Sequence, residues 1–260
     1  MADAIFAAIE AHEALFGWGS TLDAGTGVHS LRWLLQTPAA PLSAITASTN
    51  LEQDVRRGLE GELGQTRLLI GNWSDPELLA DERFEVVVAD YLLGALDAYQ
   101  PYGQDLLFPR LGQVVAPGGR LYVVGLEPSP PAATEPWGEL VLATERLRDA
   151  MIRLAGDRCY REFPKLWVVR ALERAGFSVE ASQVFPIRYG PRWIKRQLGV
   201  GRSKLARIDS DLGAALEARA AQIEELAEAA GEERAVFGED YLVVARGPEA
   251  CPSGTAGGRG

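Results

Sequence analysis

The segment Leu22-Asp23-Ala24-Gly25-Thr26-Gly27 constrains this sequence more than any other. It follows a short stretch that can form a strand and opens the amphipathic run 28–35. Glycines let the backbone approach a ligand without a Cβ in the way. The first turn of a helix offers N–H groups and partial positive charge to a carboxylate or phosphate, whereas an acid before the turn suits an ammonium or a hydroxyl. The pattern therefore predicts a cradle for a ligand that carries both charges.

A Gly-x-Gly turn is common, but two further turns follow it in order along the chain. They are Ala116-Pro117-Gly118-Gly119, before an apolar strand, and Ala175-Gly176-Phe177. Together the three turns resemble the class I S-adenosylmethionine-dependent methyltransferase family, over residues 18–187 and the last strand. That family has an acidic-x-Gly-x-Gly turn after its first strand, a Pro-Gly-Gly turn into its fifth and an Ala-Gly-Phe turn into its sixth. The resemblance implies S-adenosylmethionine as cofactor and S-adenosylhomocysteine as product.

Short apolar segments alternate with amphipathic ones, which predicts strands at 21–24, 43–48, 67–70, 84–89, 120–126, 177–187 and 241–245. Helices are expected at 3–16, after the glycines, at 51–62, from Ser74 onward, and at 104–115, 140–155 and 164–175. This order predicts an α/β fold with a doubly wound, mostly parallel, Rossmann-like sheet of seven strands. The last strand follows the sixth without a simple crossover and is expected to be antiparallel, as in the resembled family.

Four regions are expected. Residues 1–17 form a helix that either covers the cofactor or packs on the sheet; residues 18–187 and 237–247 form the methyltransferase core. Residues 188–236 are a helical insertion that serves as a lid or a dimer contact, and 248–260 are a disordered tail. The insertion begins with a basic stretch that is either a solvated face or an attraction for an anionic substrate: Arg188, Arg192, Lys195, Arg196, Arg202, Lys204 and Arg207.

Composition narrows the partners. The formal net charge of -10 argues against binding to nucleic acid phosphates. Cys159 and Cys251 lie far apart, and only two histidines are present, so we expect neither a metal site nor a disulfide framework. No apolar run is long enough for a bilayer, and the start of the chain is not a signal peptide. We expect a cytoplasmic protein with a small-molecule substrate, no membrane contact and a possible homodimer.

Ligands of such sheets bind at the carboxyl ends of the strands. The resemblance implies that Asp23, Gly25, Thr26 and Gly27 hold the methionine end of the cofactor, with Asp23 acting on the ammonium directly or through water. A Leu or Trp side chain filling the space above the two glycines would contradict this role.

The other cofactor positions depart from the family pattern. Where the family has an acid for the ribose hydroxyls this chain has Ser48, with Thr49 and Gln53 nearby; Ser48 and Thr49 are equally explained as helix caps. Asn72 is expected to accept from the adenine amine, while Trp73 packs either on adenine or in the core.

Asp90 and Tyr91 fall beside the transferable methyl group. Leu92 and Leu93 replace the prolines of enzymes that methylate base amines, which disfavours that substrate class.

Methyl transfer from a sulfonium needs alignment more than acid–base help. A hydroxyl or carboxyl acceptor could use a base, and Asp90, His29 and Glu127 are the candidates, although a lone His at a helix start is more often structural. Four residues in loops on the substrate side are weaker candidates, each also explained by packing: Trp137, Tyr160, Arg161 and Tyr189.

The hypothesis is a methyltransferase acting on an O or N atom of a small molecule. A binding or scaffold protein that keeps the fold without turnover is an alternative, motivated by the missing acid at Ser48, and a protein methyltransferase is another. A nicotinamide-dependent oxidoreductase is disfavoured because Ser30 stands where its third glycine should be and the acid after the second strand is absent.

Overall fold

The structure is a computed structural model that describes residues 4–230 and 235–248. These residues form one seven-stranded sheet in the order β3-β2-β1-β4-β5-β7-β6. The strands are β1 (Thr21–Asp23), β2 (Leu42–Thr46), β3 (Arg67–Ile70), β4 (Phe84–Asp90), β5 (Val115–Leu126), β6 (Ser178–Tyr189) and β7 (Ala235–Arg246). Strands β1 to β5 pair in parallel, and β7 runs antiparallel to both of its neighbours. The predicted Rossmann-like sheet with one reversed strand is confirmed.

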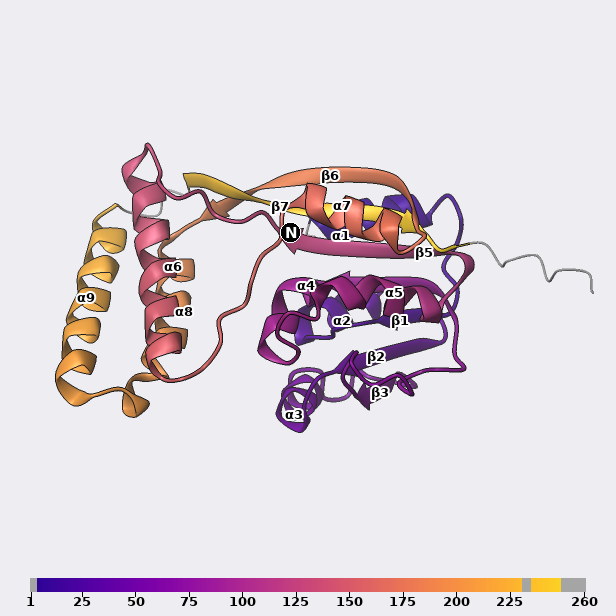
Figure 1. Cartoon of the computed structure of the whole chain (residues 1–260), viewed down its shortest axis with the longest axis horizontal. Coiled ribbons are helices and arrows are strands. Elements are labelled where there is room, and N and C mark those ends of the chain that lie inside the picture. The colour runs from indigo at the N-terminus through magenta and orange to yellow at the C-terminus, as the bar shows by residue number, and fades with distance from the viewer. Residues whose placement is uncertain (1–3, 231–234, 249–260) are drawn as a thin grey trace, which may run out of the picture.

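Helices surround the sheet in three groups (Figure 1). The first group is α1 (Ala4–Glu13), α2 (Val28–Leu34) and α3 (Thr49–Gly58), and the second is α4 (Leu92–Ala95), α5 (Gln104–Val114) and α7 (Lys165–Arg174). The third is α6 (Pro136–Leu154), α8 (Pro191–Arg202) and α9 (Ser210–Ala229), which stand beyond the carboxyl ends of the parallel strands. Short 3-10 turns at 96–98 and 205–207 follow α4 and α8. None of the described helices is long and apolar enough to cross a membrane.

The apolar run of β4 explains the layering. Val87 and Ala89 pack against the side of α5 and α7, while Val86 and Val88 pack against the side of α1 and α2. Successive side chains of a strand point to opposite faces, so a strand covered on both faces needs apolar residues throughout. The prediction that this strand is buried on both faces is confirmed.

The predicted helix from Ser74 is wrong. The chain there makes a series of tight turns, in which the amide of Ala80 bonds the carbonyl of Glu77. Leu79 has φ 57°, a left-handed conformation that cannot continue a right-handed helix. The cap residue and the early proline were sufficient signals for a turn but not for a helix.

Helices α6, α8 and α9 form a unit with its own apolar core, which we call the helical unit. Its buried side chains are Leu147, Met151, Ile194, Leu198, Ala220, Ile223 and Ala227. Gly201 of α8 packs so closely on α6 that an added Cβ would lie 2.5 Å from the sulfur of Met151. The sequence predicted a helical insertion at 188–236 alone, but α6 precedes β6 and belongs to the same unit.

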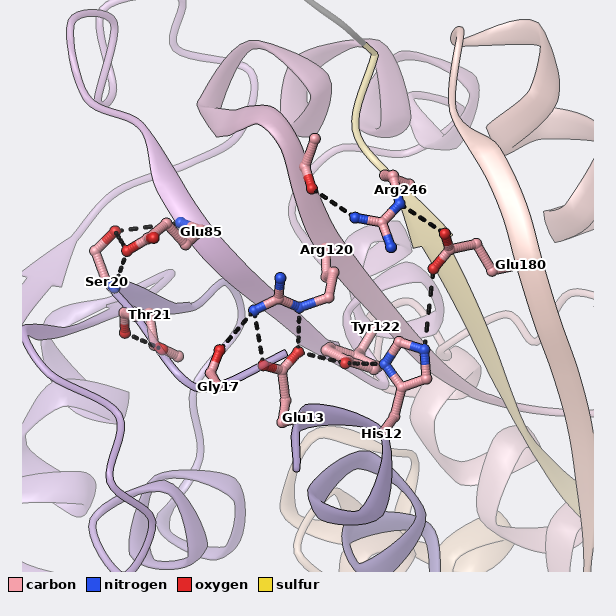
Figure 2. A network of polar contacts seen from close by, with 12 residues as sticks. His12, Glu13, Gly17, Ser20, Thr21, Glu85, Arg120, Tyr122, Glu180 and Arg246 are labelled. Carbon is pink, nitrogen blue, oxygen red and sulfur yellow. Dashed lines mark hydrogen bonds and ion pairs between the residues drawn. The ribbon is translucent and has the colours of Figure 1, made fainter. Parts of the chain in front are cut away.

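Helix α1 packs along the sheet through Ile5, Phe6 and Ile9. Its last turn is tied to β5 by a buried ion pair, in which Arg120 donates to both carboxylate oxygens of Glu13, at 2.5 and 2.8 Å. The hydroxyl of Tyr122 also donates to Glu13 and therefore accepts from Nδ1 of His12, at 2.6 Å. Figure 2 shows this network reaching Glu180 and Arg246 on the two strands beyond β5. Of the two roles expected for this helix, the structure supports packing on the sheet.

Replacing Glu13 with Gln should destabilise the protein by about 3 kcal/mol, because the guanidinium of Arg120 would remain buried without a counter-charge. The matched control is Glu10→Gln on the same helix. Glu10 is exposed and accepts from the indole of Trp33, a bond that Gln preserves, so its effect should stay within about 0.5 kcal/mol. Urea denaturation of the three proteins measures both values, and equal stability of the two variants would contradict the role of the ion pair.

Candidate functional site

The turn after β1 is organised by a buried carboxylate. Asp23 has no exposed surface, and its Oδ2 accepts from the hydroxyls of Thr26 at 2.6 Å and Ser30 at 2.9 Å. Its Oδ1 is buried without a hydrogen-bond partner among the described residues. Burial raises the pKa of Asp23 to about 6, against the lowering effect of the two hydroxyls and of the backbone N–H of Gly25. Asp23 therefore braces the turn from beneath rather than offering an exposed carboxylate to a ligand.

Ser30, which stands where a nicotinamide-binding turn would have its third glycine, has a structural role that the sequence analysis did not assign. Its hydroxyl joins the brace to the turn, because it donates to Asp23 and accepts from the N–H of Gly27 at 3.2 Å. The available signal was a hydroxyl three residues after a helix-capping glycine, which is the spacing of a capping interaction.

The two glycines of the turn have different surroundings. A Cβ at Gly27 would meet no atom within 4 Å, so its face is open. A Cβ at Gly25 would lie 2.8 Å from Cδ1 of Leu92, the first residue of α4. A leucine side chain therefore fills the space on the Cβ side of Gly25. Glycine is needed at this position because a larger residue would clash with Leu92. The open face of Gly27 remains available to a ligand.

The predicted residues at the ends of β2 and β3 have local structural partners. The hydroxyl of Ser48 accepts from the amide of Leu51 at 3.4 Å and caps α3, while Thr49 and Gln53 lie exposed on that helix. The side-chain oxygen of Asn72 accepts from both the amide and the hydroxyl of Ser74, at 3.0 Å each. Both bonds lie within its own turn, and the expectation that Asn72 accepts from an adenine amine stays a prediction.

Trp73 belongs to the core. It is 6% exposed, and its indole N–H donates to the carbonyl of Ala24 at 2.7 Å. The ring packs among Leu22, Ile45 and other core residues beneath the turn after β1. This corrects the alternative in which the ring stacks on adenine.

Tyr91 ends β4 in a strained conformation. Its φ of 48° and ψ of 18° are left-handed, its amide donates to the carbonyl of Val124 at 3.1 Å, and its side chain is 40% exposed. A bulky residue held in this region costs of order 1–3 kcal/mol, and such strain gathers at functional sites. Asp90, beside it, is half-buried at the carboxyl end of the strand.

The three predicted bases lie in different parts of the fold. The ring of His29 is exposed on α2 and lies 5.1 Å from the ring of Phe6. Glu127 accepts from the amide of Lys165 at 2.9 Å and so caps the first turn of α7. Asp90 is the one of the three that lies at the end of β4.

A cavity of about 850 Å³ lies between the strand ends and the helical unit. Tyr91, Leu126 and Tyr189 contribute its sheet side. Much of the opposite wall comes from the start of α8, with Gly190, Pro191, Arg192, Trp193 and Arg196. Of the four substrate-side candidates, only Tyr189 lines it.

The other three substrate-side candidates lie elsewhere. Trp137 packs against the core of the helical unit, and Tyr160 is 61% exposed. Arg161 forms an ion pair with the buried Asp97 at 3.8 Å. None of these three lines the cavity, and their contacts with a substrate stay predictions.

Glu162 was missed by sequence reasoning. Its carboxylate lies against α4, since a Cβ at Gly94 would be 2.7 Å from Oε2 of Glu162. Burial raises its pKa to about 7; Arg148 opposes the rise and the charge of Asp240 adds to it. A carboxyl that titrates near neutral pH beside the end of β4 is suited to proton transfer. A single glutamate in a loop carries no sequence signal of this.

The sequence matches no protein-family model and no curated protein. The fold is similar to that of BH2331 from Bacillus halodurans C-125, a proposed methyltransferase, with 19% identity, a TM-score of 0.62, and 94% of this chain and 98% of that chain covered. It is also similar to the [4+2]-cyclase SpnF, with 17% identity, a TM-score of 0.59, and 95% of this chain and 81% of that chain covered. A SAM-dependent methyltransferase from Methanosarcina mazei is similar as well, with 13% identity, a TM-score of 0.56, and 93% of this chain and 98% of that chain covered. At these identities the likeness shows the fold, which is that of the methyltransferases among them.

The pKa of Asp23 predicts a pH dependence of stability. The pKa of Asp23 in the folded protein, about 6, lies above its ordinary value of 3.8. The stability that the protonated Asp23 side chain contributes is therefore fully present below pH 4 and is lost as the pH rises through 6. Asp23→Asn removes this ionisation. As the pH rises from 3.5 to 7.5, the free energy of unfolding of Asp23→Asn should therefore increase relative to that of the wild type by up to about 3 kcal/mol. Denaturant unfolding across this range measures the gain, with the exposed Asp54→Asn as control. Parallel pH profiles of wild type and Asp23→Asn would refute the assignment.

Proposed function

We propose that the protein is an S-adenosylmethionine-dependent methyltransferase that acts on an O or N atom of a small molecule. The observation that carries the proposal is the open turn at Gly27, at the carboxyl end of β1 and on a methyltransferase fold. The large cavity that begins at Tyr91, one strand away, supports an acceptor site next to it.

The residues of the turn fit the methionine end of the cofactor. Asp23 holds Thr26 and Ser30 in place, and its unpartnered Oδ1 leaves a carboxylate oxygen that favours positive charge nearby. Gly27 presents backbone without a side chain. Ser48 fits the ribose less well than an acid would, because its hydroxyl already caps α3 and cannot serve as a double acceptor.

When bound, the cofactor supplies an electrophilic methyl group on a good leaving group. The protein then has to align the acceptor and exclude water. Tyr91 follows β4, the neighbour of β1, and lines the cavity, and the bond of its amide to Val124 helps to hold its backbone in place. For a hydroxyl acceptor, Glu162 is the carboxyl best suited to take the proton, because its pKa of about 7 allows both forms at neutral pH.

A second candidate is a ligand-binding protein without methyl transfer. The capping role of Ser48 and the packing of Leu92 on Gly25 favour it, since both reduce the surface left for the cofactor. A [4+2]-cyclase has a similar fold, so the fold is also compatible with a reaction other than methyl transfer. Transfer of a labelled methyl group, tested separately against metabolites and against proteins, distinguishes this candidate and a protein methyltransferase from the proposed function.

Gly27→Ala tests cofactor binding without disturbing the fold. Gly27 has an extended backbone that any residue adopts, and the added methyl would meet no protein atom within 4 Å. Because Gly27 is the N-cap of α2, where Ala is less favourable than Gly, stability should fall by up to about 1 kcal/mol. The methyl would instead occupy space needed by the ligand, and the Kd for S-adenosylhomocysteine should rise at least tenfold by isothermal titration.

The control is Gly199→Ala, an exposed position of α8 that is equally free of close atoms and should bind like the wild type. Failure of the wild type to bind S-adenosylhomocysteine would refute the proposed function. Wild-type affinity in Gly27→Ala would show that the ligand does not use this turn.

A further inference from the structure

We propose that the cavity between the strand ends and the helical unit binds an anionic acceptor: an apolar body that carries a carboxylate or phosphate group. The acceptor role rests on the proposed methyl transfer, whereas the binding of the anion rests on the cavity alone. The anionic group would bind to Arg188, Arg192 and Arg196, all of which line the cavity.

The basic stretch of the insertion divides into two halves with different surroundings. In the second half every cation named here has a carboxylate partner: Arg202 pairs with Glu217 and Glu224, while Lys204 and Arg207 pair with Asp157. In the first half, Arg188, Arg192 and Arg196 form no ion pair or side-chain hydrogen bond with any described residue. The cations of the second half form ion pairs within the protein, whereas the three arginines of the first half are available to bind a ligand.

The three arginines converge through their positions in the chain. Arg188 lies near the end of β6, and Arg192 and Arg196 are four residues apart, so they share one face of α8. The N-cap of this 12-residue helix, Gly190, has no side-chain cap and also lines the cavity. The partial positive charge of the helix end adds to that of the arginines.

Three guanidinium groups line one cavity and repel one another, and the same lining holds two acids, so three positive charges face two negative ones. Asp240 and Glu228 are the acids of the cavity wall, and they come from the start of β7 and the end of α9 rather than from α8. A carboxylate or phosphate on the arginine side would relieve the repulsion through charge-assisted hydrogen bonds. This local excess of positive charge stands out in a chain with a formal net charge of -10.

The rest of the wall defines the body and orientation of the ligand. Tyr91, Leu126, Ile187 and Trp193 provide apolar and aromatic surface. With its anionic group on the arginines, the opposite end of the ligand would point toward Tyr91 at the end of β4. The arrangement thus selects an amphiphilic anion and places its uncharged end beside the predicted methyl donor.

The test uses three probes on the full chain: benzoate, phenyl phosphate and the neutral benzyl alcohol. Isothermal titration at low salt should give at least one of the two anions a Kd tenfold or more below that of benzyl alcohol, and added NaCl should weaken it. The preferred anion tells a carboxylate from a phosphate ligand. In Arg188→Gln/Arg192→Gln/Arg196→Gln the Kd for that anion should rise at least tenfold.

The control, Arg170→Gln/Arg174→Gln/Lys195→Gln, removes the same total charge at exposed positions outside the cavity and should stay within twofold of the wild type. Circular dichroism and thermal melting check folding; if the triple cavity variant unfolds, Arg192→Gln and Arg196→Gln alone should each raise the Kd at least threefold. Equal binding of anions and benzyl alcohol by the wild type, or equal losses in the cavity and control variants, would overturn the proposal.

Titration of S-adenosylhomocysteine on the same samples separates the two proposals. Binding of the cofactor product without selective anion binding would overturn the anionic acceptor and leave the methyltransferase. Arginine-dependent anion binding without any binding of S-adenosylhomocysteine would leave the anion site and overturn its role in methyl transfer.

Discussion

The site depends on a carboxylate that is buried without full compensation. Asp23 keeps the loop after β1 in place through the hydroxyls of Thr26 and Ser30, while its second oxygen has no partner among the described residues. Burying an acid in this way costs stability, as its raised pKa indicates. This loss of stability occurs in the loop where the backbone of Gly27 is open to a ligand. A loop whose backbone is held by buried hydrogen bonds and exposed on one face is preorganised for binding.

The sheet was predictable because its signals are local. The apolar run of β4 and the glycine and proline turns before β5 and β6 each fix one element, and their order fixes the topology. The helix expected from Ser74 failed because a single left-handed residue, Leu79, decides the path of the chain there. Tertiary packing sets a positive φ of this kind, and a leucine in the sequence gives no local signal for it.

The candidate site was predictable only where a backbone requirement selected the residue. Gly27 is open as expected, but Gly25 is a glycine because of Leu92, which is 67 positions away in the chain. Ser48, Asn72 and Glu127 accept hydrogen bonds from backbone amides, which explains them as structural residues, and their expected roles at a ligand stay predictions. Polar residues at strand ends serve as caps as readily as they serve as ligands, and their spacing is the same in both cases.

The helical unit changes what the fold can do. Its helices come from two separate segments, one before β6 and one between β6 and β7, and they share a single apolar core. Because that core holds α8 beyond the carboxyl ends of the strands, Arg192, Trp193 and Arg196 of its first two turns line the cavity opposite the sheet. Tyr91, which follows β4, lines the same cavity, and β4 is the neighbour of the strand that leads into the loop braced by Asp23. The helical unit thus makes the strand ends one wall of a cavity, which the sheet alone would leave open.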